Sequence, residues 1–277
     1  MNRASAFRRL TIGLAALAGL ALAAPAAAQG DLLVAPTRVV IANGGNAEVV
    51  LSNIGEKPAT YRISLELRRM DEQGDFNDID EANANAGERA ALDMVRYAPR
   101  RITLLPGQPQ AVRISVRPPE GLPDGEYRVH MSFRAIPPAD TPEQAAAAGP
   151  ATGVQIRLTP IYGITIPVFV RKGRLEAQAS LGKAQVMRGD GGAWLEIDMA
   201  RTGNRSVYGE VIGKSARGEQ LFLLRGVAVY PEVTRRKVQV PLNPEQLAKL
   251  HGAVKIEYRE LPENGGALLA ETTATFP

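Results

Sequence analysis

The chain has 277 residues, of which 33 are basic, 29 are acidic, two are histidine and none is cysteine. Without cysteine, a disulfide framework, a thiolate metal site and a cysteine nucleophile are all excluded. The net charge of +4 falls to about +1 without the first 28 residues, which hold three arginines and no acid, so no basic field favours nucleic-acid binding.

The N-terminus is typical of a secretory signal peptide. Three arginines lie among the first nine residues, an apolar run covers residues 10–24, and the small residues 26–28 offer a cleavage site. The apolar run has 15 residues, fewer than the ~20 that a membrane span needs. We therefore expect cleavage of residues 1–28 rather than an uncleaved anchor, and no membrane insertion of the exported chain.

From residue 32 to residue 136 the chain alternates short apolar stretches with turns rich in Gly, Pro and Asn. Apolar side chains recur at every second position in the following stretches: Val39 to Ile41, Val49 to Leu51, Tyr61 to Leu67, Val112 to Val116 and Tyr127 to Phe133. This period of two is typical of strands with one buried face. The spacing predicts an immunoglobulin-like β-sandwich, in which Tyr127 resembles a tyrosine corner.

Residues 71–93 interrupt this pattern with many acidic side chains. The calcium-loop spacing is not met, because Gln73 stands at the second ligand position and the glycine lies at 74 instead of 76. We expect a solvated loop here.

Residues 153–171 form the longest alternating stretch of the chain. Its apolar positions are Val154, Ile156, Leu158, Ile164, Ile166, Val168 and Val170. Such a strand is much longer than the usual ~5–6 residues. A strand of this length cannot easily bury its whole apolar face in the core of its own domain. We therefore expect part of this face to bind another protein.

A second set of alternating strands follows Arg171. A cap residue and a proline at Asn243 and Pro244 predict a short helix over residues 245–250. The chain is thus predicted to be all-β, with two tandem immunoglobulin-like sandwich domains, an N-terminal one at residues 29–170 and a C-terminal one at residues 171–277.

Residues for catalysis are scarce. The only histidines are His130 and His251, and the alternation of its strand predicts an outward, exposed side chain for His130. No nucleophile elbow and no glycine-rich phosphate loop is present. We therefore expect neither an enzyme nor a cofactor or metal.

Arg38 interrupts an otherwise apolar first strand. One interpretation is an edge charge that discourages aggregation. Arg157 and Arg171, on the long strand, are open to the same interpretation.

Taken as a set, several segments of the first domain resemble the periplasmic pilus-assembly chaperones of the PapD-like family. The segments are A-P-T-R-V at residues 35–39, L-S-N at 51–53, L-L-P-G at 104–107, F-R-A-I-P at 133–137 and the stretch 160–171. The resemblance implies a chaperone that lends a strand to pilus subunits whose immunoglobulin-like fold is incomplete. By position, the donor residues would be Val154, Ile156 and Leu158.

The resemblance also implies a basic pair that anchors the subunit's C-terminal carboxylate. Arg38 matches its first member, whereas Thr165 lies at or near the position of the family's lysine. This departure either weakens the anchor or passes the role to Arg157 or Arg171. The resemblance further implies a periplasmic location, pilus or fimbrial subunits as clients, delivery to an outer-membrane usher, and no need for ATP.

The alternative is an exported tandem immunoglobulin-like protein that is itself a structural or adhesion component of a pilus or surface. That hypothesis expects a free donor segment before the first strand, and only residues 29–31 precede Leu32 after the predicted cleavage.

Overall fold

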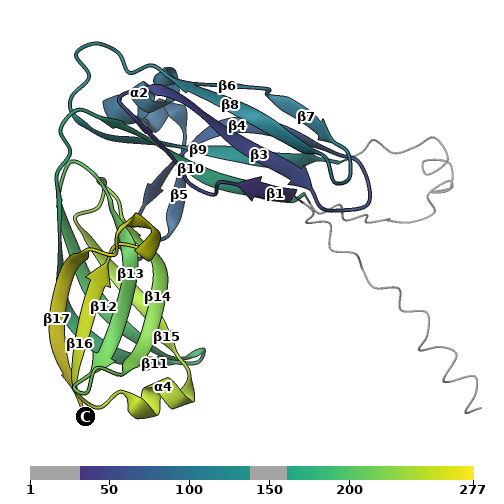
Figure 1. Cartoon of the computed structure of the whole chain (residues 1–277). Coiled ribbons are helices and arrows are strands. Elements are labelled where there is room, and N and C mark those ends of the chain that lie inside the picture. The colour runs from purple at the N-terminus through teal and green to yellow at the C-terminus, as the bar shows by residue number, and fades with distance from the viewer. Residues whose placement is uncertain (1–31, 138–160) are drawn as a thin grey trace, which may run out of the picture. The chain divides into compact units, whose positions relative to one another are not determined.

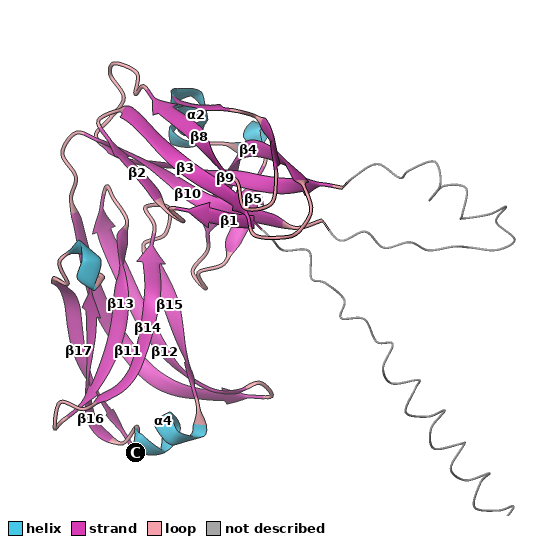
Figure 2. Cartoon of the chain, turned by 45° about the vertical axis from the view of Figure 1, so that its right-hand side comes forward, coloured by secondary structure: helices cyan, strands magenta, loops and turns pink. Residues whose placement is uncertain are grey.

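The computed structural model describes residues 32–137 and 161–277. Strands dominate these residues, and the helices are short (Figure 2). The predicted signal peptide, residues 1–28, and the predicted donor residues Val154, Ile156 and Leu158 lie outside the described residues. Within the described ranges, no helix has the length and apolar character that crossing a membrane requires.

Two sheets build the first sandwich (Figure 1). One sheet has the strand order β1 (Leu32–Ala35), β3 (Gly45–Asn53), β8 (Pro109–Val116) and β6 (Val95–Ala98). The other has the order β2 (Val39–Ala42), β10 (Gly163–Lys172), β9 (Gly125–Ile136), β4 (Ala59–Met70) and β5 (Phe76–Ile79), with β7 (Arg101–Leu104) also paired to β4.

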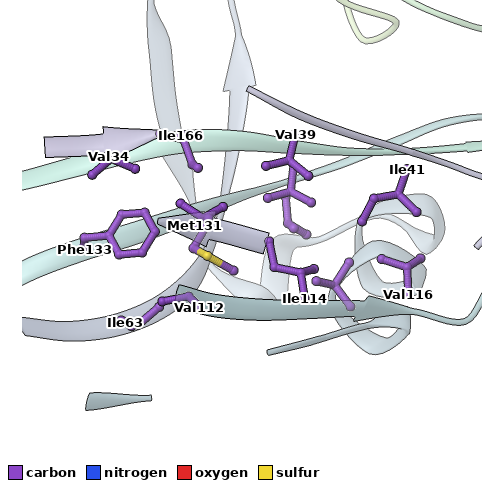
Figure 3. Close-up of a cluster of buried hydrophobic side chains, with 14 of the residues drawn as sticks. Val34, Val39, Ile41, Ile63, Val112, Ile114, Val116, Met131, Phe133 and Ile166 are labelled. Carbon is purple, nitrogen blue, oxygen red and sulfur yellow. The ribbon is translucent and has the colours of Figure 1, made fainter. Parts of the chain in front are cut away.

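The core of this sandwich consists of the inward residues of both sheets. Figure 3 shows Met131 and Phe133 of β9 facing Val112 and Ile114 of β8, and all four are at most 1% exposed. Ile166, Val168 and Val170 of β10 are buried in the same cluster, as the alternation predicts. Burial of such side chains contributes roughly 1.5–3 kcal/mol each.

The first strand changes sheet at Arg38. β1 pairs with β3 in one sheet, whereas β2 runs parallel to β10 in the other, with Val39 opposite Val168. Residues 36–38 bridge the two sheets and leave Arg38 at the start of β2. The predicted tyrosine corner is confirmed, because the hydroxyl of Tyr127 donates a hydrogen bond of 2.7 Å to the carbonyl of Pro123.

The expectation of a solvated loop over residues 71–93 is wrong. This segment contains β5, the 3₁₀ helix η1 (Glu81–Asn83) and the helix α2 (Ala86–Met94). A capping box between Asn85 and Glu88 starts α2. Glu88 also binds Arg69 of β4 at 2.6 Å, and Ala91 and Met94 reach the core. The acidic composition did not indicate an ordered segment, because only a few apolar residues, among them Ala91 and Met94, pack into the core.

The second sandwich also has two sheets (Figure 1). Their strand orders are β11 (Ala177–Gly189), β12 (Gly192–Gly203), β15 (Arg235–Leu242), and β14 (Gln220–Val229), β13 (Val207–Ser215), β16 (Gly252–Arg259), β17 (Leu268–Phe276). The predicted helix is confirmed as α4 (Pro244–Lys249), capped by Asn243 and Gln246. A 3₁₀ turn, η2 (Pro262–Asn264), precedes β17. The prediction of two tandem sandwiches is confirmed, while the exact domain boundaries stay a prediction.

A buried carboxylate joins the outer positions of β13, β16 and β17. Glu257 of β16 accepts hydrogen bonds from Lys214 Nζ at 2.9 Å and Arg259 Nε at 2.7 Å. Lys255 bridges Glu257 to Glu271 of β17. The bonds from Lys214 and Arg259 lower the pKa of Glu257 to about 2.

Glu257 makes the stability of the protein depend on pH. Because its folded pKa lies below the ordinary value of 4.5, the carboxylate adds stability above about pH 4.5 that is lost as the pH falls toward 2. We expect Glu257→Gln to unfold at lower urea concentration than the parent at pH 7. The difference should shrink between about pH 5 and pH 2.5. A difference that stays constant over this range would contradict the assignment.

Candidate functional site

The outward face of β10 continues into the surroundings of Arg38. Since Ile166, Val168 and Val170 point into the core, Thr165, Pro167, Phe169 and Arg171 lie on the other face of the sheet. Phe169 is nevertheless fully buried, because it packs against Tyr230 of the second sandwich with 5.7 Å between the ring centroids. An outward phenylalanine is the signal in the sequence that this face is covered.

The Arg38 guanidinium is held by aromatic rings. Its Cζ atom lies 3.9 Å from the ring centroid of Phe169 and 4.3 Å from that of Tyr208 in β13. Both distances are in the range of cation–π attraction. Among the described residues, no carboxylate lies within 4 Å of this guanidinium, so its charge is oriented but not neutralised.

Other arginines on the same face are neutralised. Arg171 Nε binds Glu126 Oε2 at 2.9 Å, and the Glu126 side chain is only 1% exposed. Arg128 lies over the ring of Tyr230 at 3.9 Å and also forms an ion pair with Glu232. Arg38 and Arg128 thus both lie over aromatic rings. Of these two arginines, only Arg128 has an acidic partner among the described residues.

Thr165 lies on the outward face of β10, the same face as Phe169, which contacts Arg38. Because Val39 stands opposite Val168 in a parallel pair, Arg38 lies level with Pro167, and Thr165 lies two residues earlier on the same face. The Thr165 hydroxyl is half-buried and donates a long hydrogen bond of 3.5 Å to Ser132 Oγ. A hydroxyl group supplies no positive charge. The correspondence between Thr165 and the family's lysine stays a prediction. Arg157, the other candidate cation, lies outside the described residues.

Half of β10 presents an open backbone edge. β2 pairs only with Val168 to Arg171, whereas Gly163 to Pro167 pair with β9 alone within the described part of the chain. Ile161 and Tyr162, just before β10, are 47% and 44% exposed. An unpaired edge with apolar side chains beside it is a template for pairing with another chain.

A cavity of about 460 Å³ opens beside Arg38. Its lining includes three arginines, Arg38, Arg171 and Arg205, and a single acid, Glu260. Among the described residues, no group of three or more His, Asp or Glu side chains is placed to hold a metal ion. The chemistry that the cavity offers is therefore the binding of an anion by guanidinium groups.

The expectation of an exposed His130 is wrong. The side chain is 4% exposed, because Phe76 of β5 packs edge-on against its ring at 5.3 Å. Alternation placed His130 correctly on the outward face, but no periodic pattern in the sequence indicated that β5 covers it. Burial, and then the charges of Arg128 and Arg68, lower the pKa of His130 to about 3.

No family model and no curated protein sequence matches the chain significantly. Among solved structures, the fold is similar to the Escherichia coli chaperone DraB, at 15% identity and a TM-score of 0.46, over 89% of this chain and 96% of that one. It is also similar to the Pseudomonas aeruginosa CupB2 chaperone, at 14% identity and a TM-score of 0.46, over 87% and 97% of the two chains.

A third similarity is to a structure of the Salmonella enterica SafA pilin in complex with the SafB chaperone, at 14% identity and a TM-score of 0.44, over 88% and 96% of the two chains. Each of these three structures contains a protein described as a chaperone.

The neutral state of His130 can be observed directly. We expect its imidazole Cε1–H proton signal to stay unchanged from about pH 8 to pH 4, because burial and two arginines disfavour the charged ring. The signal is identified by its loss in His130→Gln, and the measurement is a proton NMR titration. A midpoint near the ordinary histidine value of 6.5 would show that Phe76 does not cover the ring in solution.

Proposed function

We propose that the chain is a periplasmic chaperone for pilus or fimbrial subunits with an incomplete immunoglobulin-like fold. The observation that carries the proposal is the oriented, unneutralised Arg38 guanidinium at the end of an open strand edge. A carboxylate at the end of a client chain would supply the missing negative charge by a charge-assisted hydrogen bond. The proposal includes cleavage of residues 1–28, domains at 29–170 and 171–277, and no enzymatic step.

The register of β2 and β10 supports one direction for a client strand in this proposal. β2 runs parallel to β10 and covers it only from Val168 onward. A client strand that ends at Arg38 would occupy the same line beside Gly163 to Pro167, and would therefore also run parallel to β10. Pro167 has no N–H to donate, so the ladder with the client would end where the carboxylate meets Arg38.

The donor segment would extend this edge backward. Val154, Ile156 and Leu158 precede β10 with the same alternation as Ile164 and Ile166. Three aliphatic side chains buried in a client at ~1.5–3 kcal/mol each contribute roughly 5–9 kcal/mol of gross hydrophobic free energy. Association costs offset much of this, which fits a carrier that holds its client and later releases it to an outer-membrane usher.

The carboxylate anchor is tested with Arg38→Gln. We expect the variant to bind a synthetic client-like peptide of alternating aliphatic residues about tenfold or more weakly when the peptide ends in a free carboxylate. The same peptide with an amidated end should bind parent and variant equally. The measurement is fluorescence anisotropy of the labelled peptide.

Arg113→Gln is the matched control. The Arg113 side chain is 83% exposed and pairs with Glu48, and both residues lie in the sheet that does not contain β10. Arg113→Gln should leave both affinities unchanged. Equal binding of the free-acid peptide by the parent and Arg38→Gln would mean that Arg38 is only an edge charge.

The donor register is tested with Leu158→Asp. A charge placed in the client's apolar groove should weaken capture of the same peptide in both its free and amidated forms, since the cost is that of burying a carboxylate. The melting temperature, measured by circular dichroism, should stay within a few degrees of the parent's. An unfolded variant would show that Leu158 belongs to the chaperone's own core.

A further inference from the structure

The cavity beside Arg38 needs a second cation if it is to hold a carboxylate by two groups, and the sequence offers Thr165 where a lysine is expected. Arg171 lines the cavity, but its Nε atom is occupied by the buried Glu126 at 2.9 Å. Arg205 lines the same cavity. Among the described residues, it has no carboxylate within 4 Å.

Hydrogen bonds on both sides hold Arg205 in place. It lies in the turn between β12 and β13, where the backbone carbonyl of Asn204 accepts a bond of 3.0 Å from the Glu126 N–H. The N–H of Ser206 donates to Glu126 Oε1 at 3.1 Å. In addition, Arg201 Nη1 donates to the Arg205 carbonyl at 2.9 Å. The turn that carries Arg205 is thus fastened to β9 of the first sandwich, the strand that neighbours β10.

The Arg205 side chain keeps most of its donors free. Its Nη1 donates one long bond of 3.3 Å to the carbonyl of Ser206, and a guanidinium has five N–H donors. The side chain is half-buried, so a hydrogen bond to an anion there is less screened than one on an open surface.

The charge balance of the cavity fits one anion of charge −1. Its lining has three arginines and Glu260, and Glu126 neutralises Arg171 from behind. One positive charge is left over, which a single carboxylate neutralises. A phosphate or a dicarboxylate would leave the cavity negatively charged.

We propose that Arg205, from the second sandwich, is the second cation of the carboxylate site, in the role that the sequence resemblance gives to a lysine on the long strand. The inference rests on the proposed function, because it takes Arg38 as the first cation. The ligand class is a terminal monocarboxylate, held by guanidinium groups from both sandwiches.

The test uses arginine Nε–Hε signals in ¹H–¹⁵N NMR spectra of the protein purified after expression of the full chain. The probe is N-acetyl-L-alanine, with N-acetyl-L-alanine amide as the uncharged control. Arg38→Gln and Arg205→Gln identify the two signals by their loss. We expect both signals to shift with one common dissociation constant when the acid is added, and neither to shift with the amide.

The variants add a measure of affinity. Arg205→Gln should weaken binding of the acid about tenfold, and Arg205→Lys should weaken it less, because lysine keeps the charge and loses the fork of donors. Arg225→Gln is the matched control. Arg225 is an exposed arginine that pairs with Glu210, and its substitution should change nothing.

The possible outcomes separate the two proposals. If Arg38 responds to the acid while Arg205 does not, and Arg205→Gln keeps the parent affinity, then Arg205 is not the second cation and the proposed function stands. If Arg38 does not respond, the proposed function fails together with the inference. A loss of the dispersed spectrum in Arg205→Gln shifts the decision to Arg205→Lys and to the signals of the parent protein.

Discussion

The aromatic cage around the Arg38 guanidinium is the interaction on which the candidate site depends. Phe169 and Tyr208 attract the cation through their ring faces, at 3.9 and 4.3 Å, and a ring face has no net charge to give. The rings therefore orient the Arg38 guanidinium without neutralising its charge. Arg128 shows the contrast, since it lies as close to Tyr230 but is paired with Glu232. The difference between the two arginines is a missing acid.

The cage depends in turn on the outward face of β10. Phe169 can reach Arg38 because β2 is parallel to β10 and starts one residue after Arg38. It stays buried because Tyr230 of the second sandwich covers it. The same short β2 leaves Gly163 to Pro167 paired on one side only within the described residues. One feature, the late start of β2, thus yields both the open edge and the charge at its end.

Alternation in the sequence was enough to predict the sandwiches, the inward residues of β10 and the tyrosine corner, because these depend on the period of a strand. It was not enough for His130 or for residues 71–93. The burial of His130 depends on Phe76 of β5, a strand too short and too polar to be recognised by period. The order of residues 71–93 depends on the packing of Ala91 and Met94 of α2 into the core. Arg38 could be singled out as a charge in an apolar strand, whereas its cage comes from Phe169 and from Tyr208, which is 39 residues further along the chain.

The carrier that we propose would have to bind an ionic group strongly enough to hold it and weakly enough to release it, and an aromatic cage would meet both needs. A buried acid beside Arg38 would compete with the client carboxylate, as Glu126 does at Arg171. With no cage at all, the guanidinium would lose side-chain entropy on every binding event. The rings orient the guanidinium beforehand, and the hydrogen bond between the Arg38 and Tyr230 side chains leaves further N–H donors for a carboxylate. The departure at Thr165 fits the same proposal, in which a threonine keeps the strand polar and Arg205, in a fixed turn of the other sandwich, would supply the second charge.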